Sequence, residues 1–419
     1  MKKIYTFILL VCSVSLLTAQ IDQPSVGAGY ANTTFYNLED GNTISVEHTD
    51  WDIAFNVTQF NVGVIVNEGV GLSFAAPLPT VQLFQTNSTD FSTVDTIGIS
   101  RIYNDEVSWS AGAFNSVADG SNQLDYGWGD YDTGTNQVIG TRVFAIKLRN
   151  DEYKKLEIQS LINGVYTFRF ADLDGSNEVT TTIDKANYPN KTLAYYSIEN
   201  ETVLDLEPTN WDMTFTRYVT PLADGSGGTI DYTLTGVLTN AGVQAVQSDG
   251  IDPSTIDHLD YSDDYSDSLT IIGHDWKSFQ GSWMIEAERV YFVKTVNEDI
   301  WKIQFIDFEG SSTGTTTLEK TLMDGTSSTS KIAKHFSSFN VFPNPATDFT
   351  NLVFDVKTYE GDAQVQIINH LGQRVYNENI KIHNGLNARQ LSLNYPSGLY
   401  HIALQIGNDF ITSPLLKNK

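Results

Sequence analysis

The chain has 419 residues, with 51 acidic and 25 basic side chains and a formal net charge of −26. Nucleic-acid binding depends on Lys and Arg side chains that release counterions from phosphates, so a surface this acidic predicts no nucleic-acid partner.

The first element in chain order is a secretory signal peptide. A lysine pair precedes an apolar run over residues 4–17, and Ala19 offers a small residue to a signal peptidase, so we predict removal of residues 1–19. A lipoprotein alternative would use Cys12, but Val11 before it is larger than lipobox chemistry prefers.

The processed chain has few reactive groups. The first 20 residues hold two lysines, no acid and the single cysteine, so their removal leaves 23 basic and 51 acidic side chains and a net charge of −28. Disulfides, thiol catalysis and Cys-ligated metal sites are then excluded. No other apolar stretch approaches the ~20 residues of a membrane-spanning helix.

Two stretches of the chain are repeated. Tyr36 to Phe55 aligns without a gap on Tyr196 to Phe215, an offset of 160, and Arg142 to Leu161 aligns on Arg289 to Phe308, an offset of 147. A period near 150 residues is one domain long and too long for a solenoid. We therefore predict a duplicated domain, the first copy spanning residues 20–187 and the second copy residues 188–332, followed by a linker over residues 333–338 and a further domain over residues 339–419.

The fold class is all-β. Apolar and polar residues alternate, β-branched and aromatic residues are abundant, and Gly, Asn and Asp recur at short intervals. The second repeated block predicts a hairpin in each copy, over 142–149 with 153–161 and over 289–296 with 300–308. We expect two mostly antiparallel β-domains and a small C-terminal β-sandwich, with only short helices.

Each copy carries a Trp-Asp pair, Trp51-Asp52 and Trp211-Asp212. A tryptophan beside a cleft can stack on a planar ligand, whereas a buried one anchors the core while the carboxylate accepts hydrogen bonds from a turn. Because packing must persist after duplication while ligand residues diverge, we favour structural anchors.

Two other segments have open interpretations. The loop from Asp125 to Asp132 mixes aromatics, Gly and Asp, which is typical of sugar- or peptide-binding loops and equally of inward-packed loops. The second segment is an acidic run that offers candidate calcium ligands, although a solvated loop explains it too. Its carboxylates are Asp257, Asp260, Asp263, Asp264 and Asp267.

The last 80 residues alternate cleanly, as in 364–367, 390–394 and 400–406. Their motifs resemble the C-terminal sorting domain of the type IX secretion system of Bacteroidetes; the motifs are Val341–Ala346, Ile368–Val375, Pro396–Tyr400 and Leu415–Lys417. The resemblance implies the type IX machinery as a partner and export across the outer membrane, with release or attachment at the cell surface.

The duplicated domain resembles the HmuY family, surface or secreted proteins of which some capture haem. The first copy shows this in Trp51–Phe55, Val143–Lys147, Tyr153–Ile158 and Tyr166–Phe170, and the second in Trp211–Phe215, Gly273–Lys277 and Val290–Lys294. Haem needs axial ligands such as His or Met. The first copy has neither between His48 and its end. The second copy supplies the candidates Met213, His258, His274 and Met284.

No catalytic motif is present: the chain has no His-Glu-x-x-His, Gly-x-Ser-x-Gly or phosphate-binding glycine loop. We therefore expect a secreted or cell-surface, non-catalytic ligand-binding protein, with haem suggested by resemblance only. The alternative is a structural or adhesive surface protein that contacts glycans or proteins, and a hydrolase is third. Haem and calcium are the cofactors to consider.

Overall fold

The computed structural model describes residues 19–69, 81–324, 336–357, 359–369, 373–406 and 409–418. The chain forms two compact units, residues 1–324 and 325–419. The predicted signal peptide with Cys12 and residues 333–335 of the predicted linker lie outside the described residues, whereas residues 336–338 already belong to a strand.

The fold is all-β, as predicted. Helices among the described residues are single 3₁₀ turns: η1 (Ala28–Tyr30), η2 (Phe91–Thr93), η3 (Ala113–Asn115), η4 (Lys185–Asn187), η5 (His258–Tyr261) and η6 (Gly310–Ser312). None of the helices in this part of the chain has the length and apolarity to cross a membrane.

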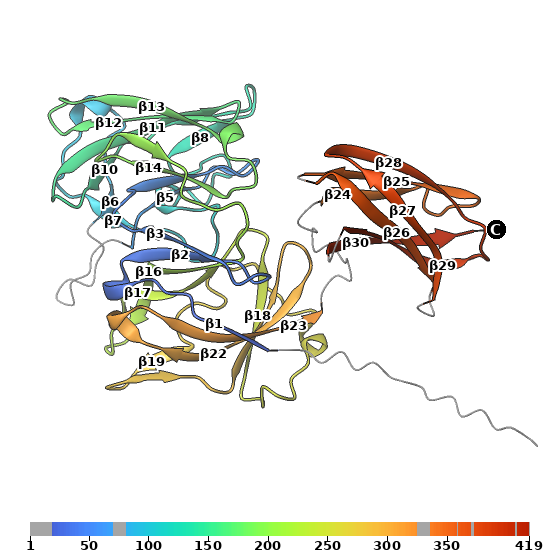
Figure 1. Ribbon diagram of the computed structural model, residues 1–419. Coiled ribbons are helices and arrows are strands. Elements are labelled where there is room, and N and C mark those ends of the chain that lie inside the picture. The colour runs from blue at the N-terminus through green and yellow to red at the C-terminus, as the bar shows by residue number, and fades with distance from the viewer. Residues whose placement is uncertain are drawn as a thin grey trace, which may run out of the picture. The chain divides into compact units, whose positions relative to one another are not determined.

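The first unit stacks four antiparallel sheets, visible as layers in Figure 1. The first outer sheet has the order β13 (Val179–Asp184), β12 (Val165–Asp172), β11 (Tyr153–Ile162), β10 (Phe144–Lys147), β6 (Gln82–Gln85), β7 (Ser100–Ile102), with β9 (Gln137–Gly140) on β11 and β8 (Gly129–Asp132) on β9. The first inner sheet is β15 (Thr202–Leu204), β14 (Leu193–Ser197), β4 (Ile53–Asn56), β5 (Val64–Val66).

The other two layers repeat this plan. The second inner sheet is β17 (Thr229–Thr239), β16 (Met213–Ala223), β2 (Asn32–Tyr36), β3 (Thr43–Glu47). The second outer sheet is β1 (Gln20–Asp22), β23 (Thr316–Asp324), β22 (Ile300–Phe308), β21 (Arg289–Lys294), β18 (Gln244–Asp249). A separate hairpin is formed by β19 (Lys277–Phe279) and β20 (Trp283–Ile285).

The two inner sheets exchange hairpins. Strand β2, from the first copy, pairs with β16 so that Tyr36 lies opposite Met213. Strand β14, from the second copy, pairs with β4 so that Tyr196 lies opposite Ile53. The two pairs are related by the same offset of 160 residues. Each predicted copy therefore completes the sheet of the other, and a cut between residues 187 and 188 would separate β14 from its partner.

Alternation along the exchanged strands creates three buried layers of side chains, because successive residues of a strand point to opposite faces. In β14, Ala194 and Tyr196 pack in the core beneath the first outer sheet, whereas Leu193 and Tyr195 face the second inner sheet. Strand β2 alternates in the same way: Tyr36 packs in the core beneath the second outer sheet, and Phe35 packs between the inner sheets.

The second unit is a two-sheet antiparallel sandwich. Its sheets are β24 (Phe336–Phe342), β25 (Phe349–Val356), β28 (Gly385–Ser392) and β27 (Arg374–Ile382), β26 (Gly361–Asn369), β29 (Gly398–Ile406), β30 (Asp409–Lys417). Alternate residues such as Leu352, Val365 and Ile402 fill its core. The predicted antiparallel sandwich is thus confirmed.

Candidate functional site

The layer between the two inner sheets, which we call the joint, contains both repeated tryptophans. It buries Phe35, Val46, Trp51, Ala54, Ile65, Leu193, Tyr195 and Trp211. Trp51 packs edge-on against Tyr195, and Trp211 packs edge-on against Phe35, each at a ring-centre distance of 5.0 Å. Trp211 is only 4% exposed. Both rings therefore hold the two predicted copies together.

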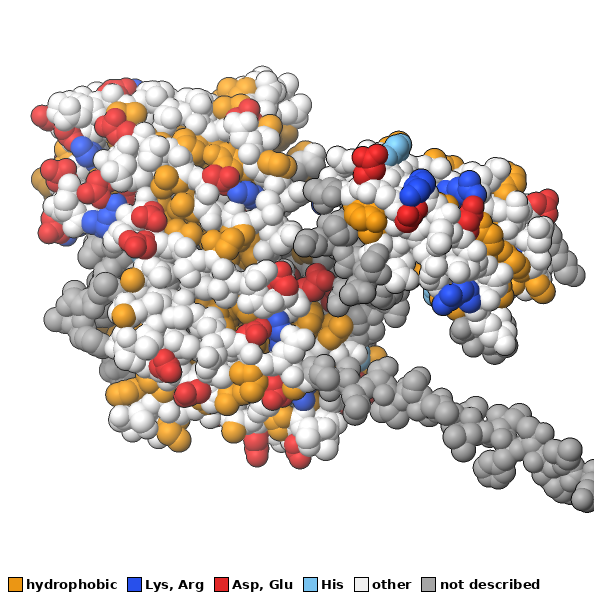
Figure 2. Space-filling view, viewed as in Figure 1, with side chains coloured by type: hydrophobic (Ala, Val, Ile, Leu, Met, Phe, Trp, Pro, Cys, Tyr) orange, Lys and Arg blue, Asp and Glu red, His pale blue; other side chains and the backbone are white. Residues whose placement is uncertain are grey.

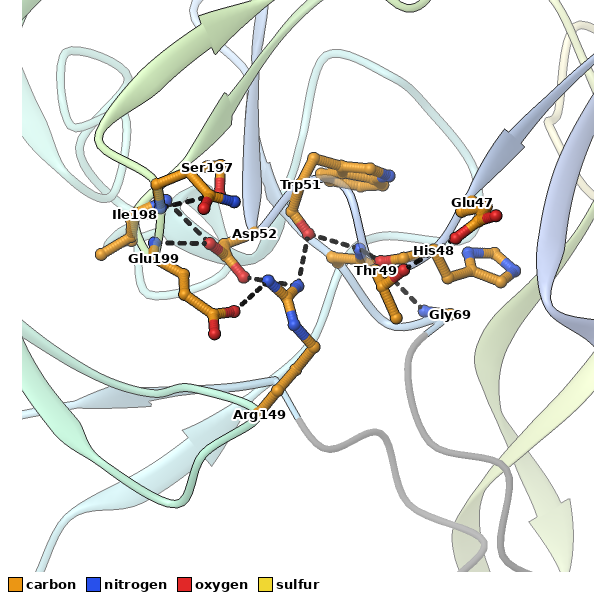
Figure 3. Close-up of polar contacts among 12 residues, drawn as sticks. Glu47, His48, Thr49, Trp51, Asp52, Gly69, Arg149, Ser197, Ile198 and Glu199 are labelled. Carbon is orange, nitrogen blue, oxygen red and sulfur yellow. Dashed lines mark hydrogen bonds and ion pairs between the residues drawn. The ribbon is translucent and has the colours of Figure 1, made fainter.

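The aspartates beside these tryptophans bind the exchanged hairpins. Asp52 accepts hydrogen bonds from the backbone N–H groups of Ile198 (2.7 Å) and Glu199 (3.2 Å), in the turn after β14 (Figure 3). Asp212 accepts one from the N–H of Leu38 (2.7 Å), in the turn after β2. Each carboxylate thus satisfies backbone donors at the tip of the other copy's hairpin.

The two aspartates differ in their counter-charge. Arg149 lies 2.9 Å from Asp52 and also contacts Glu199 (Figure 3). The residue aligned with Arg149 in the second copy is Val296, and burial raises the pKa of Asp212 to about 6. The pKa of Asp52 is also raised by burial, but the Arg149 charge opposes that rise.

A second buried polar group lies at the edge of the joint. His48 is 3% exposed, and its Nε2 has no hydrogen-bond partner in the described part of the chain. Burial, with Arg217 nearby, lowers the pKa of His48 to about 3, so the imidazole is neutral. Gly69 is required beside it, because a Cβ there would lie 2.1 Å from His48 Nδ1. Burial also raises the pKa of Glu68 to about 7.

These groups line a small, partly open cavity of about 80 Å³. A water molecule needs roughly 10–15 Å³ of such volume, so the cavity has room for a few waters. Pockets that hold drug-sized ligands measure about 300–1,000 Å³. The joint therefore connects the two predicted copies, and its cavity has space only for solvent or a very small ligand.

The four candidate haem ligands do not converge. Met213 is fully buried in the core beneath the second outer sheet, and Met284 is half exposed on β20. His258 packs beside Phe292 on β21, whereas His274 lies 3.2 Å from the hydroxyl of Tyr218 on β16. Burial lowers the pKa of His274. His48 and Glu68 were not among the predicted site residues, because nothing in their local sequence pattern signals burial.

The candidate calcium ligands are all exposed. Asp257 accepts a hydrogen bond from the N–H of Leu259 at the start of η5, and Asp260 lies within that turn. Asp263, Asp264 and Asp267 follow it in the same loop. In the described ranges no group of three or more His, Cys, Asp or Glu side chains is arranged to hold a metal ion. Acidic side chains are spread over the visible face of the first unit rather than gathered in one patch (Figure 2).

The aromatic loop from Asp125 to Asp132 borders an open groove, which we call the Phe60 groove. Trp128 in this loop is fully buried and donates to the carbonyl of Val62, so it is a structural residue. Tyr126 is partly exposed and lines the groove. The groove has a volume of about 380 Å³ and is lined by Gln59, Phe60, Asn61, Val62, Ser110, Ala111, Asn115, Ala118, Asp125 and Tyr126.

Phe60, in the turn between β4 and β5, was missed by the sequence analysis. Its side chain is 92% exposed, and its backbone has φ = 62°. A bulky residue rarely adopts this left-handed conformation, and an exposed phenyl ring gains no burial energy in return. No sequence signal marks the position, because an isolated Phe in an apolar-rich chain ordinarily indicates core.

Comparisons with known proteins identify two regions. Residues 340–418 match the family model for the secretion system C-terminal sorting domain, and residues 29–170 match the family model for HmuY protein. The sorting domain indicates type IX export, to the cell surface or as a secreted protein. The HmuY match does not extend over the second copy, whose likeness to that family stays a prediction.

No curated protein matches the chain. Among solved structures, dimeric latent PorU from Porphyromonas gingivalis matches at 9% identity with a TM-score of 0.18. That match covers 80% of this chain and 29% of PorU, so this chain spans less than a third of that protein's length. A TM-score this low carries no argument about fold or function.

Proposed function

We propose that the protein is a secreted or surface-displayed, non-catalytic binding protein whose ligand occupies the Phe60 groove. The observation that carries the proposal is Phe60 itself, which holds an exposed ring in a strained backbone conformation at the lip of an open groove. Backbone strain that packing does not explain is typical of functional sites. The sorting domain supports the location.

Haem is the ligand that the HmuY match suggests, and the described residues do not fit it. The cavity in the joint is far smaller than pockets for drug-sized ligands, and haem is at least as large as such ligands. The candidate axial residues His258 and His274 contact different strands, β21 and β16. A haem placed in the joint would require the two inner sheets to separate.

The test is a paired ligand screen on the full chain. Wild type and Phe60→Gly are titrated with haemin, followed by the Soret absorbance, and with soluble oligosaccharides and short peptides, followed by thermal unfolding. We expect an oligosaccharide or peptide that stabilises the wild type and not Phe60→Gly, and no Soret shift with haemin.

Two outcomes would contradict the proposal. A Soret shift that persists in Phe60→Gly would locate the ligand elsewhere, and its loss in His48→Ala would then assign it to the joint. Absence of any ligand would favour the purely structural alternative, in which both copies act as spacers.

A further inference from the structure

The turn that carries Phe60 is held by hydrogen bonds from side chains to its carbonyl groups. Lys185 Nζ donates to the carbonyl oxygens of Thr58 (3.0 Å) and Asn61. The hydroxyl of Tyr166 shares its one proton between the carbonyls of Asn56 (3.1 Å), just before the turn, and Asn61 (3.3 Å). Trp128 Nε1 donates to the carbonyl of Val62 (2.9 Å). These contacts hold the backbone of the turn in place, so the position from which the ring projects is preorganised.

The groove has no unpaired charge. Asp125 is the one carboxylate among its described lining residues, and Arg142 binds both carboxylate oxygens, at 2.8 and 2.6 Å. Hydrogen bonds from Arg142 lower the pKa of Asp125 to about 2, so the pair stays ionised and mutually neutralised. A charged ligand would therefore meet no counter-ion here, and a neutral one is favoured.

Neutral polar groups surround the exposed ring. The Gln59 amide and the Tyr126 hydroxyl carry no hydrogen bond to any described residue. Ser110 Oγ accepts from Asn61 Nδ2 (2.6 Å) and keeps its own proton to donate. One face of the ligand can thus contact an aromatic ring while its edges exchange hydrogen bonds with an amide and two hydroxyls.

The backbone around the groove offers a peptide no free sheet edge. One recurring way in which peptides bind β-proteins is to add a strand to a free sheet edge, using unpaired main-chain groups. The groove is instead bounded by turns, and the carbonyls of Val62 and Tyr126 are both bonded to Asn115 Nδ2. Strand addition is therefore disfavoured, and side chains supply the main contacts for recognition.

From these observations we infer that the Phe60 groove is a binding site for a neutral glycan. A sugar ring has an apolar C–H face that packs on an aromatic ring and hydroxyl groups around its rim that suit amides and hydroxyls. The inference rests on the proposed function of the groove. The second copy has no counterpart at the aligned position, because the residue at the offset of 160 from Phe60 is Thr220, inside the continuous strand β16.

The experiment uses arrays that carry neutral glycans, acidic glycans and peptides, probed with the full-length processed chain. The variants are Phe60→Gly, which removes both the ring and the strain, and Phe60→Trp, which keeps an aromatic ring. Phe279→Ala is the matched control, because Phe279 is 65% exposed and does not line the groove. Thermal unfolding of each variant checks that it is folded.

We expect binding to neutral glycans that Phe60→Gly weakens at least about tenfold, as truncation of an aromatic anchor does. Phe60→Trp and Phe279→Ala should retain it. Binding only to acidic glycans or peptides that Phe60→Gly abolishes would overturn the glycan inference and leave the groove as the site. Binding that Phe60→Gly leaves unchanged, or no binding at all, would overturn both.

Discussion

The two predicted copies use aligned strands for different purposes. Strand β4 ends at Asn56, and the chain turns through Phe60 before β5 begins. The aligned strand β16 runs without interruption from Met213 to Ala223. The aspartate directly before each strand binds the hairpin of the other copy in both cases, so the difference in the course of the chain lies beyond the anchor. Because the Trp-Asp anchor precedes the strand, the residues after Asn56 can form a turn beside a groove, although the aligned residues of β16 continue as a strand.

The anchors themselves also differ in electrostatics. Asp52 is ion-paired with Arg149, whereas Asp212 faces no such charge and has a raised pKa. Trp211 Nε1 donates to Glu207, whose pKa is raised to about 6 by burial. Both carboxylates are buried, so the two joint contacts differ in counter-charge: Asp52 is ion-paired, and Asp212 has no ion pair with a described residue. The predictions below separate them.

The largest effect should come from the tryptophans. Trp211→Ala should cost about 3–5 kcal/mol of unfolding free energy, as truncation of a buried aromatic ring generally does. Trp51→Ala should cost a similar amount if the two anchors are equivalent. Urea unfolding followed by circular dichroism measures both. A cost under about 1 kcal/mol for either one would show that its ring is not an anchor, since exposed positions typically stay within ±0.5 kcal/mol.

The next contrast concerns the two carboxylates. Asp52→Asn should cost about 2–4 kcal/mol, because it leaves the Arg149 charge without its buried partner. Asp212→Asn should be neutral or stabilising at pH 7, since an amide oxygen can still accept from Leu38 without a buried charge. Equal losses in the two variants would contradict the assignment of the ion pair to one side only.

The pH dependence of stability sharpens that contrast. The pKa of Asp212 is 3.8 in the unfolded chain and about 6 in the folded protein, so the folded state binds a proton more tightly. The resulting stabilisation is fully present below about pH 4 and is lost as the pH rises through 6. At about 1.4 kcal/mol per pKa unit, the stability of wild type relative to Asp212→Asn should fall by about 2–3 kcal/mol between pH 4 and 7. A flat difference would mean that Asp212 is solvated.

The smallest effect comes from the position where the strands diverge. Phe60→Gly should stabilise the fold by about 0.5–1 kcal/mol, because glycine adopts a positive φ without strain. Thr220→Gly should instead destabilise it by about 1 kcal/mol, because glycine weakens the interior of a strand. Thermal unfolding of the pair gives shifts of opposite sign if the two positions differ as described.

The local sequence pattern alone predicted the strands, two of the hairpins and the C-terminal unit. The hairpins predicted over 142–149 with 153–161 and over 289–296 with 300–308 are the antiparallel pairs β10–β11 and β21–β22, because two-residue alternation is a property of neighbouring residues. The sorting motifs likewise indicated the C-terminal unit. The burial of Trp211 agrees with its interpretation as an anchor.

Only the tertiary structure decided which hairpin completes which sheet. Strand β14 pairs with β4, and β2 pairs with β16, at positions related by the offset of 160 residues. Because β4 and β16 are repeats of one another, β2 and β14 could each pair with either strand. No local pattern shows that each pairs with the strand of the other copy. The exposure of Phe60 and the burial of His48 depend on segments far away in sequence, such as Lys185 beneath the turn and Gly69 beside the imidazole. Side-chain burial is a property of the assembled layers, and periodicity along one strand carries no information about what packs on it.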